Sequence, residues 1–342
     1  MAKTSKTLLC LAAGSAALWY LTRQVRGALI SFAHKNVFIT GGSRGLGLVL
    51  ARRFSTEGAR VAICARDADE HERAARDSAW QGERPLTVVA DVTDPVQVRQ
   101  AVSRIEGDLG PIDVLVNNAS IISVGPVSTM TREDFEEAMR ITFWGAFNAI
   151  QAVVPGMRER GDGRIVNISS IGGKIGVPHL APYCASKFAL SGYSQALRAE
   201  LADDGITVTT IYPGLMRTGS PRNAVFKARQ EAEYGWFKVS ASLPLLTVSA
   251  EHAARCIMNA TRRGDAELVI SLPAKAGIVM HALFPEMTST LISLANRLLP
   301  SAGGAGRAAK PGKDIELPAA LAPVTALMAR AAESNNEINP VE

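Results

Sequence analysis

A glycine-rich turn between an apolar segment and a helical segment is the feature that most constrains what this chain can fold into. The apolar segment, residues 36–40, reads NVFIT, and the turn, residues 41–47, reads GGSRGLG. Residues 48–57 then follow a helical pattern. Glycines let a backbone approach phosphate groups closely, and the free N–H groups at the start of a helix point toward such an anion. Strand, turn and helix in this order therefore predict a seat for the pyrophosphate of a dinucleotide.

Short apolar segments alternate with helical segments along most of the chain. The further predicted strands are residues 60–64, 86–90, 112–116, 164–169, 207–211 and 266–271. The predicted helices include residues 96–105, 131–150 and 250–262. Thr131 and Asp134 have the spacing of a capping box, and Ser249 is a plausible N-cap residue. Strands that alternate with helices predict an α/β fold with a parallel, doubly wound sheet.

The end of the second predicted strand indicates which dinucleotide the chain binds. An acidic residue there would hydrogen-bond the ribose 2′-hydroxyl of NAD(H), but residues 65 and 66 are alanine and arginine. Arg66, together with Arg44 in the glycine turn, is placed to bind a 2′-phosphate instead. This pattern predicts NADP(H). Asp67 follows immediately and keeps NAD(H) open, and simple surface exposure of both arginines is the alternative.

A serine, a tyrosine and a lysine within residues 170–187 form a candidate catalytic group. Ser170 follows the predicted strand at residues 164–169, and Tyr183 and Lys187 are four residues apart, on one face of a helix. An ammonium beside a phenol favours the phenolate and lowers the tyrosine pKa from about 10. Such a phenol exchanges a proton with a substrate oxygen near neutral pH, and Ser170 is placed to hydrogen-bond the same oxygen. The alternative is an ordinary exposed helix pair, because Tyr-x-x-x-Lys often arises by chance.

Composition argues against several classes of function. The chain has 342 residues and a formal net charge of +5, and its arginines are scattered, which argues against nucleic-acid binding. Cys10, Cys64, Cys184 and Cys256 are far apart, which suits a reducing compartment and gives no disulfide framework or zinc site. We therefore expect a cytoplasmic protein that binds neither metal nor nucleic acid.

The N-terminal segment, residues 1–34, contains an apolar run at residues 8–21, LLCLAAGSAALWYL, with basic residues on both sides. As a helix this run would be about 21 Å long at ~1.5 Å per residue, shorter than a ~30 Å hydrocarbon core. One interpretation is a short signal anchor or a membrane-surface helix, with the catalytic domain facing the cytosol. A cleaved signal peptide and an N-terminal helix packed on the domain are the alternatives.

Three segments lie outside the alternating pattern. Residues 215–246 carry four aromatic side chains after the end of a strand, where ligands bind in such sheets, and predict a substrate lid or a packed surface subdomain. Residues 273–300 are strongly apolar and predict a helix pair that packs on the core or on a second copy; a membrane-docking surface is the alternative. Residues 301–342 are rich in Ala, Gly and Pro and predict a mostly disordered tail with a weak helix at residues 319–332.

Taken in order, these motifs resemble the classical short-chain dehydrogenase/reductase family over roughly residues 35–271. Residues 40–47 match the family's T-G-x-x-x-G-x-G turn, residues 117–119 most of its N-N-A-G element, and residues 213–218 its P-G-x-x-x-T element. Ser170, Tyr183 and Lys187 match its catalytic serine, tyrosine and lysine. The predicted cofactor contacts are Gly41, Ser43, Arg44, Gly45, Leu46, Gly47, Arg66, Asp91, Val92, Asn118, Ala119, Tyr183, Lys187, Pro213, Gly214 and Thr218. The resemblance implies a Rossmann-like sheet of about seven strands with helices on both faces, a single catalytic domain at residues 35–272, and a homodimer or homotetramer.

Two positions depart from the family pattern. Ser120 stands where the family usually has glycine, and Thr142 stands where a helix asparagine usually completes the catalytic group. In the family that asparagine supports a water relay to the lysine. A threonine hydroxyl can also hold a water, but with a different geometry. Thr142 is therefore a candidate catalytic residue whose contribution the sequence leaves open.

The resemblance implies an oxidoreductase that transfers a hydride between NADP(H) and a carbonyl or secondary alcohol. Tyr183 is expected as general acid or base, Lys187 as the group that lowers its pKa and holds the nicotinamide ribose, and Ser170 as the group that polarises the substrate carbonyl. The apolar segments favour a hydrophobic substrate such as a ketone, steroid, retinoid or long-chain aldehyde, and the N-terminus resembles that of membrane-anchored hydroxysteroid and retinol dehydrogenases of the family. An NADP(H)-binding sensor or scaffold without turnover is the alternative, supported by Ser120 and Thr142.

Overall fold

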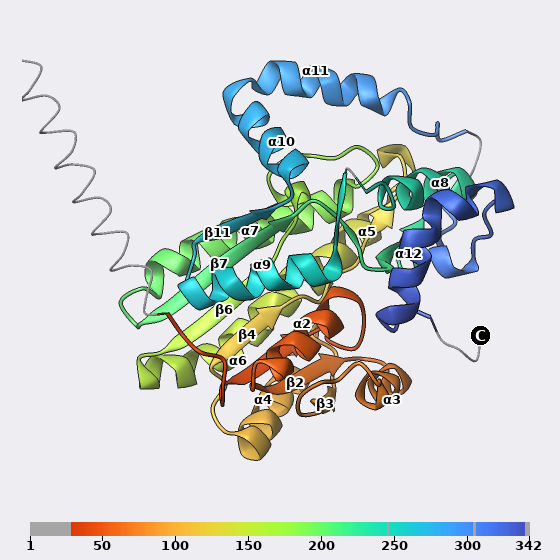
Figure 1. Ribbon diagram of the computed structural model, residues 1–342. Coiled ribbons are helices and arrows are strands. Elements are labelled where there is room, and N and C mark those ends of the chain that lie inside the picture. Colours follow the sequence, from red (N-terminus) through yellow and green to blue (C-terminus); the bar gives the residue numbers. More distant parts are fainter. Residues whose placement is uncertain (1–28, 245, 304–305, 339–342) are drawn as a thin grey trace, which may run out of the picture.

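The predicted strands form one parallel sheet in the computed structural model, which describes residues 29–244, 246–303 and 306–338 (Figure 1). In their order across the sheet, the seven strands are β3 (Leu86–Val89), β2 (Arg60–Ala65), β1 (Asn36–Thr40), β4 (Val114–Asn117), β6 (Gly163–Ile168), β7 (Ile206–Pro213) and β11 (Glu267–Ile270). Every neighbouring pair in this sheet runs parallel. The expected Rossmann-like, doubly wound sheet is confirmed.

The strand order reverses between β1 and β4. From β1 the chain builds outward to β2 and β3, and it then returns to place β4 on the other side of β1. Thr40 at the end of β1 is in register with Cys64 of β2 and with Asn117 of β4, so these three strands end side by side. Open α/β sheets bind their ligands in the crevice outside such a reversal.

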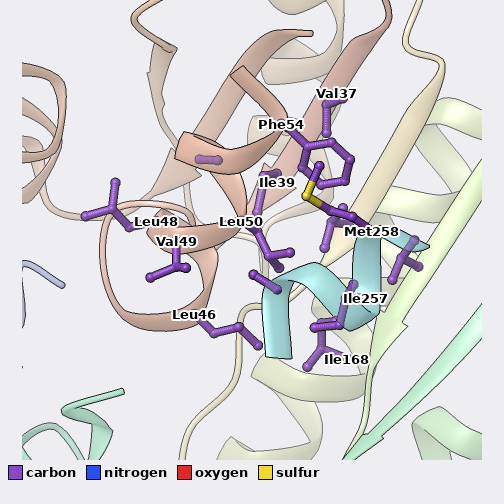
Figure 2. Packing of buried hydrophobic residues seen from close by; sticks show 14 of the residues in the cluster. Val37, Ile39, Leu46, Leu48, Val49, Leu50, Phe54, Ile168, Ile257 and Met258 are labelled. Carbon is purple, nitrogen blue, oxygen red and sulfur yellow. The ribbon is translucent and has the colours of Figure 1, made fainter. Parts of the chain in front are cut away.

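Helices cover both faces of the sheet (Figure 1). One face carries α2 (Gly45–Thr56) and α9 (Ala250–Arg263); the other carries α4 (Pro95–Leu109), α6 (Gly145–Arg160) and α7 (Ala181–Glu200); α3 (Ala68–Arg76) follows β2. Leu50 and Phe54 of α2 pack with Ile257 and Met258 of α9 and with Ile39 of β1 (Figure 2). Because the central strands are buried on both faces, their sequences are continuous apolar runs without alternation.

A π-helical turn interrupts the helix expected over residues 131–150. The helix α5 (Arg132–Ala138) begins with the predicted capping box between Thr131 and Asp134. Between α5 and α6, residues Met139–Trp144 form the π-helix η2, which contains Thr142. Turns of this kind inside helices frequently occur at functional sites.

The described residues of the segment 215–246 form a small subdomain with an aromatic core. Its elements are β8 (Leu215–Arg217), η4 (Ser220–Arg222), β9 (Val225–Phe226) and α8 (Gln230–Ser240), and they are flanked by β10 (Thr247–Ser249) and by β5 (Ser123–Val124), which pairs with β9. The ring centroid of Phe226 lies 5.1 Å from that of Tyr234 and 5.9 Å from that of Phe237, and all three side chains are buried. The aromatic residues of this segment therefore pack on one another, as in a surface subdomain.

The prediction of a mostly disordered tail is wrong for the described residues after position 301. They form β12 (Lys310–Pro311), η5 (Gly312–Asp314), η6 (Ala319–Leu321) and α12 (Ala322–Ser334). The strand β12 pairs antiparallel with β9, and α12 lies beside α8 with Met328 and Ala332 buried (Figure 1). The helix expected at residues 319–332 is present as η6 and α12. The rest of this order was missed because the tail folds by packing against the subdomain at residues 215–246, which lies far away in the chain.

The apolar segment at residues 273–300 forms α10 (Leu272–Leu283) and α11 (Pro285–Asn296), which extend away from the sheet (Figure 1). The expectation that this pair packs on the core is wrong. Its exposed large apolar side chains are Leu272, Val279, Met280, Leu283, Phe284, Met287, Leu291 and Leu294, and its buried residues are Ala274 and Thr288. Packing on a second copy or docking on a membrane stays a prediction for this surface.

The apolar run at residues 8–21 lies outside the described residues, so its membrane association also stays a prediction. In the described part of the chain, no helix combines the length and apolar character needed to cross a bilayer.

Candidate active site

The glycine turn joins β1 to α2 at the reversal of the strand order, and its backbone requires glycine. Gly41 has a φ of +64° and Gly45 a φ of +55°, in the left-handed region that side-chain-bearing residues rarely adopt. A Cβ atom on Gly47 would collide with the carbonyl oxygen of Gly41, and one on Gly41 would lie 3.0 Å from the Cα atom of Ala119. The turn is therefore packed too closely for side chains at these positions. A turn without side chains is what the close approach of a pyrophosphate to the backbone requires.

The segment after β4 holds this turn in place. The Asn118 side-chain amide donates to the carbonyl oxygens of Gly41 at 2.9 Å and Thr40 at 3.3 Å. The Thr40 hydroxyl accepts hydrogen bonds from the backbone N–H groups of Asn118 at 3.1 Å and Ala119 at 3.3 Å. Two motifs that lie far apart in the sequence thus form one hydrogen-bonded unit.

A cavity of about 770 Å³ opens beside the strand ends. The predicted cofactor residues that line it are Gly41, Ser43, Arg44, Gly45, Leu46, Arg66, Asp91, Val92, Asn118, Ala119, Tyr183, Lys187 and Thr218. Its volume lies within the usual range of small-molecule and cofactor sites, ~300–1,000 Å³. Most of the predicted cofactor contacts therefore meet at one cavity.

Gly47, Pro213 and Gly214 are not among the described residues that line the cavity. Gly47 packs against the backbone of the glycine turn, and Pro213 ends β7 in register with Ile270 of β11. A Cβ atom on Gly214 would lie 2.7 Å from the Ser271 hydroxyl oxygen, so glycine there permits close packing. We infer a supporting role in the shape of the site for these three positions.

The two arginines predicted to bind a 2′-phosphate both line the cavity, in different surroundings. Arg66 is exposed, immediately after β2. The Arg44 guanidinium forms an ion pair with Glu70, and its Nε atom lies 3.7 Å from a carboxylate oxygen of Glu337. The Ser43 hydroxyl donates to the same Glu70 carboxylate at 2.8 Å. Arg44 is therefore already neutralised in part by protein carboxylates, whereas Arg66 is open to solvent.

Tyr183 and Ser170 meet beyond the carboxyl end of β6. Tyr183 lies in the first turn of α7, and Ser170 precedes the short helix η3 (Ile171–Gly173). The Ser170 hydroxyl accepts a hydrogen bond from the backbone N–H of Gly172 at 3.0 Å and is hydrogen-bonded to the Tyr183 side chain. The serine and tyrosine predicted to share a substrate oxygen are thus brought into direct contact.

Lys187 lies one helical turn after Tyr183, with only 2% of its surface exposed. Its Nζ atom donates to the carbonyl oxygen of Ile168, the last residue of β6, at 2.8 Å. The same atom lies 5.5 Å from the centre of the Tyr183 ring. The strand end therefore fixes the ammonium over the ring, as the four-residue spacing predicts.

Burial dominates the titration of both residues. It raises the pKa of Tyr183 to about 12 and lowers the pKa of Lys187 to about 7, because each charged form loses contact with water. The Ser170 hydrogen bond lowers the pKa of Tyr183 but does not offset burial. The expectation that Lys187 brings the tyrosine pKa below 10 is therefore wrong for this arrangement. The phenol is a proton donor at neutral pH.

The two positions that depart from the family pattern contact each other. Thr142 is buried in the π-helix η2, and its hydroxyl oxygen lies 3.1 Å from that of Ser120, within hydrogen-bond distance. Ser120 lines the cavity, whereas Thr142 is not among its described lining residues. The chain thus has a linked pair of hydroxyls where the family pairs an asparagine with a glycine.

Several polar residues of the cavity were missed from the sequence. Three of them are Glu70 in α3, Asn223 after η4, and Glu337 after α12. Glu337 accepts a hydrogen bond from the Asn223 side chain, and burial raises its pKa to about 7. One sequence signal could have located Glu70. Asp67, just after β2, is the N-cap residue of α3, so Glu70 lies in the first turn of that helix, close to the end of β2. The other two belong to segments whose position no local pattern indicates.

Comparisons with known proteins agree with this geometry. The family model described as short chain dehydrogenase matches residues 35–228. The putative oxidoreductase SadH of Mycobacterium tuberculosis is 32% identical over 265 residues, which covers 77% of this chain and 95% of the relative. Dehydrogenase/reductase SDR family member 7B of Rattus norvegicus is 36% identical over 230 residues, which covers 65% of this chain and 71% of the relative.

Solved structures show the same likeness. A short-chain dehydrogenase from Streptomyces avermitilis has a TM-score of 0.65 at 28% identity, covering 77% of this chain and 97% of that chain. A gluconate 5-dehydrogenase from Burkholderia cenocepacia, in complex with NADP and tartrate, has a TM-score of 0.62 at 28% identity, covering 72% of this chain and 98% of that chain. With its motifs, sheet order and relatives in agreement, this chain belongs to the short-chain dehydrogenase/reductase family of nucleotide-binding oxidoreductases.

Proposed function

We propose that the protein transfers a hydride between NADP(H) and a carbonyl or secondary alcohol of an apolar substrate. One observation carries the proposal: the Tyr183 phenol, hydrogen-bonded to Ser170, lines the same cavity as Lys187 and the glycine turn. The turn fits a pyrophosphate because it has no room for Cβ atoms, and its bare glycine backbone can approach phosphate groups closely. The cavity of about 770 Å³ accommodates the rest of a dinucleotide. A nicotinamide dinucleotide held there supplies the hydride, and the protein supplies geometry and electrostatics.

Tyr183 handles the proton of the proposed reaction. Because its pKa lies near 12, the phenol is protonated at neutral pH and acts as the general acid in the reductive direction. The Ser170 hydroxyl is placed to donate to the same substrate oxygen, a stabilisation of ~2–4 kcal/mol at the transition state. Lys187, held by the Ile168 carbonyl, stabilises the phenolate that remains when the proton has left.

Arg66 is the main support for NADP(H) over NAD(H). It stands immediately after β2, where an acidic residue would hydrogen-bond a ribose 2′-hydroxyl, and its side chain is exposed at the cavity. Arg44 adds less attraction for a 2′-phosphate because Glu70 already pairs with it. The Burkholderia relative crystallised with NADP shows that this cofactor occurs among similar structures.

Apolar side chains at the cavity support an apolar substrate. Ile121, Ile122 and Ile141 line it together with Tyr183 and Lys187. The exposed apolar surface of α10 and α11 supports two further proposals, a homodimer or homotetramer and contact with a membrane from the cytosolic side. The names of the relatives include a gluconate dehydrogenase and a 3-ketodihydrosphingosine reductase, so they do not favour one substrate.

The decisive experiment is NADPH oxidation by the purified protein with a panel of apolar ketones and aldehydes. NADH is run in parallel, and Tyr183→Phe and Tyr193→Phe are the test and control variants, because both tyrosines belong to α7 and only Tyr183 lines the cavity among the described residues. We expect turnover with NADPH, a loss of about 10²–10⁴-fold in Tyr183→Phe, and near-normal rates in Tyr193→Phe.

The outcomes separate the hydride-transfer proposal from the sensor alternative. Tight NADPH binding that Tyr183→Phe leaves unchanged, with no turnover of any substrate by the wild-type protein, would favour a sensor or scaffold. A clear preference for NADH would overturn the role given to Arg66 and Arg44.

A further inference from the structure

Residues 335–337, which follow α12, lie against the glycine turn. We call these three residues the C-terminal strap. The backbone carbonyl of Asn335 accepts a hydrogen bond at 2.8 Å from the N–H of Gly45, the first residue of α2. The Asn336 side-chain amide donates to the carbonyl oxygens of Ser43 at 2.8 Å and Glu70 at 3.0 Å. The strap is thus bonded to the backbone of a turn that lies 293 residues earlier in the chain.

The Glu337 side chain fills the space in front of Gly45. A Cβ atom on Gly45 would lie 2.6 Å from one carboxylate oxygen of Glu337, so the carboxyl group touches the turn. Its other oxygen accepts from the Asn223 side chain and lies 3.7 Å from Nε of Arg44. The side chain is only 3% exposed, and its backbone N–H donates to the Ala332 carbonyl at 2.9 Å. The strap is therefore built into the wall of the cavity.

The strap occupies one of the N–H groups that a pyrophosphate would use. The first N–H groups of a helix have no partner inside the helix, and for this reason they bind phosphate. Here the N–H of Gly45 is taken by Asn335, and a backbone N–H has one hydrogen to donate. The carboxyl group of Glu337 occupies the space beside it, and its ionised form would also repel a second anion.

We propose that the C-terminal strap is an autoinhibitory segment that occupies the pyrophosphate seat and must leave it before a dinucleotide binds. The inference rests on the proposed binding of NADP(H) in this cavity. A strap docked 90–99% of the time weakens the apparent dinucleotide affinity about 10- to 100-fold, because only the undocked fraction is competent to bind.

Release of the strap also frees a residue that selects the cofactor. Arg44 lies between two carboxylates, Glu70 and Glu337. When Glu337 leaves, its carboxyl group, which is partly ionised at pH 7 because its pKa is about 7, leaves with it, and the guanidinium becomes more available to a 2′-phosphate. Loosening of the strap therefore strengthens NADPH binding more than NADH binding.

The first test follows amide hydrogen exchange in the wild-type protein, with and without saturating NADPH. Without nucleotide, we expect the Gly45 amide to be protected by Asn335, and the amides of Asn335 and Glu337 to be protected by their own bonds to Ala331 and Ala332. With NADPH, the glycine turn stays protected while residues 335–337 exchange faster. A strap that becomes more protected with NADPH is a lid over the bound nucleotide, and that result overturns the proposal.

The second test compares dissociation constants for NADPH and NADH. The variant Asn336→Ala/Glu337→Ala removes the side-chain contacts of the strap, and Glu333→Ala, on the exposed side of α12, is the matched control. We expect NADPH binding to tighten about tenfold in the double variant, NADH binding to tighten less, and the control to stay within about twofold of wild type. Unchanged or weaker NADPH binding in a folded double variant contradicts the proposal.

The same variants separate this inference from the proposed function. If no protein in the set binds NADPH or NADH, the cofactor assignment fails. The docking of the strap is then judged from the Gly45 amide alone, which must exchange faster in the double variant than in wild type without nucleotide. Equal exchange rates in the two proteins would show that the strap does not occupy the turn.

Discussion

At the scale of single residues, Lys187 is a buried ammonium whose protonation is linked to folding. Burial lowers its pKa from 10.5 to about 7, so between these values the unfolded chain binds more protons at this position than the folded chain. The contribution of Lys187 to stability therefore rises with pH from about 7 to about 10.5. The hydrogen bond from Nζ to the Ile168 carbonyl offsets part of the free-energy cost of burying the ammonium.

The variant Lys187→Met removes the titrating group and keeps a long aliphatic side chain. We expect its free energy of unfolding to exceed that of wild type at pH 7 by on the order of a few kcal/mol, and the difference to shrink toward pH 10. Urea unfolding of both proteins at pH 7, 8.5 and 10 measures this. Parallel pH profiles for the two proteins would contradict the assigned burial cost.

The hydroxyl pair formed by Ser120 and Thr142 predicts that the two positions are coupled. Ser120→Gly leaves the buried Thr142 hydroxyl without its partner, and Thr142→Asn brings a larger amide against the Ser120 side chain. The double variant restores the combination usual in the family. We expect the double variant to be more stable than the sum of the single effects, with a coupling energy of about 0.5–3 kcal/mol.

A double-mutant cycle in urea, with kcat measured on the same four proteins, checks this coupling. Single effects that add to within ~0.5 kcal/mol would mean that the two hydroxyls are independent. A recovery of kcat in the double variant beyond that of Thr142→Asn would assign the pair to the proton relay.

At the scale of elements, the packing of α2 against α9 holds the glycine turn in position. The turn begins at the end of β1 and runs directly into α2, so its position depends on how that helix is seated. Leu50 is fully buried between the sheet and α9 (Figure 2). We expect Leu50→Ala to lower the free energy of unfolding by about 2–5 kcal/mol, through lost apolar contact and the cavity that remains.

Leu272→Ala is the matched control for this prediction. Leu272 begins α10 and is 79% exposed, so its truncation should change the free energy of unfolding by less than about 0.5 kcal/mol. Urea unfolding of both variants gives the comparison. A loss below ~1 kcal/mol in Leu50→Ala would show that the α2–α9 contact is less important than its burial indicates.

At the scale of the whole molecule, the cavity joins segments that are far apart in the chain, so a bound dinucleotide links them. Its lining includes Gly41 from the first strand–helix unit, Lys187 from α7 and Thr218 from the subdomain at residues 215–246. A ligand that binds only the folded state stabilises it by about 2.7 kcal/mol at a concentration of 100 times its Kd. We expect NADPH at that excess to raise the unfolding temperature, and Tyr183→Phe to keep the shift.

Thermal unfolding with NADPH and with NADH at equal concentrations measures this effect. The shift should be larger with NADPH, because only this cofactor carries a 2′-phosphate for Arg66 to bind. A shift in wild type that disappears in Tyr183→Phe would place the phenol among the groups that hold the cofactor and would weaken its assignment as a pure proton donor.

The sequence by itself determined the features that depend on neighbouring residues. The strand–turn–helix unit at residues 36–56, the capping box at Thr131 and the spacing of Tyr183 and Lys187 follow from apolar runs, glycine conformations and helical periodicity. Each of these acts within a few residues of the chain, so a sequence pattern carries it. The order of such units then led to the correct family and sheet.

Only the tertiary structure decided which distant groups meet, and with what charge. It joined Ser120 to Thr142, paired Arg44 with Glu70, ordered the tail expected to be disordered, and placed Glu337 against Gly45. It also left α10 and α11 exposed, and raised the tyrosine pKa that the sequence predicted to fall. Burial and long-range contact arise when segments far apart in the chain pack together, and removal from water then outweighs the effect of a neighbouring charge.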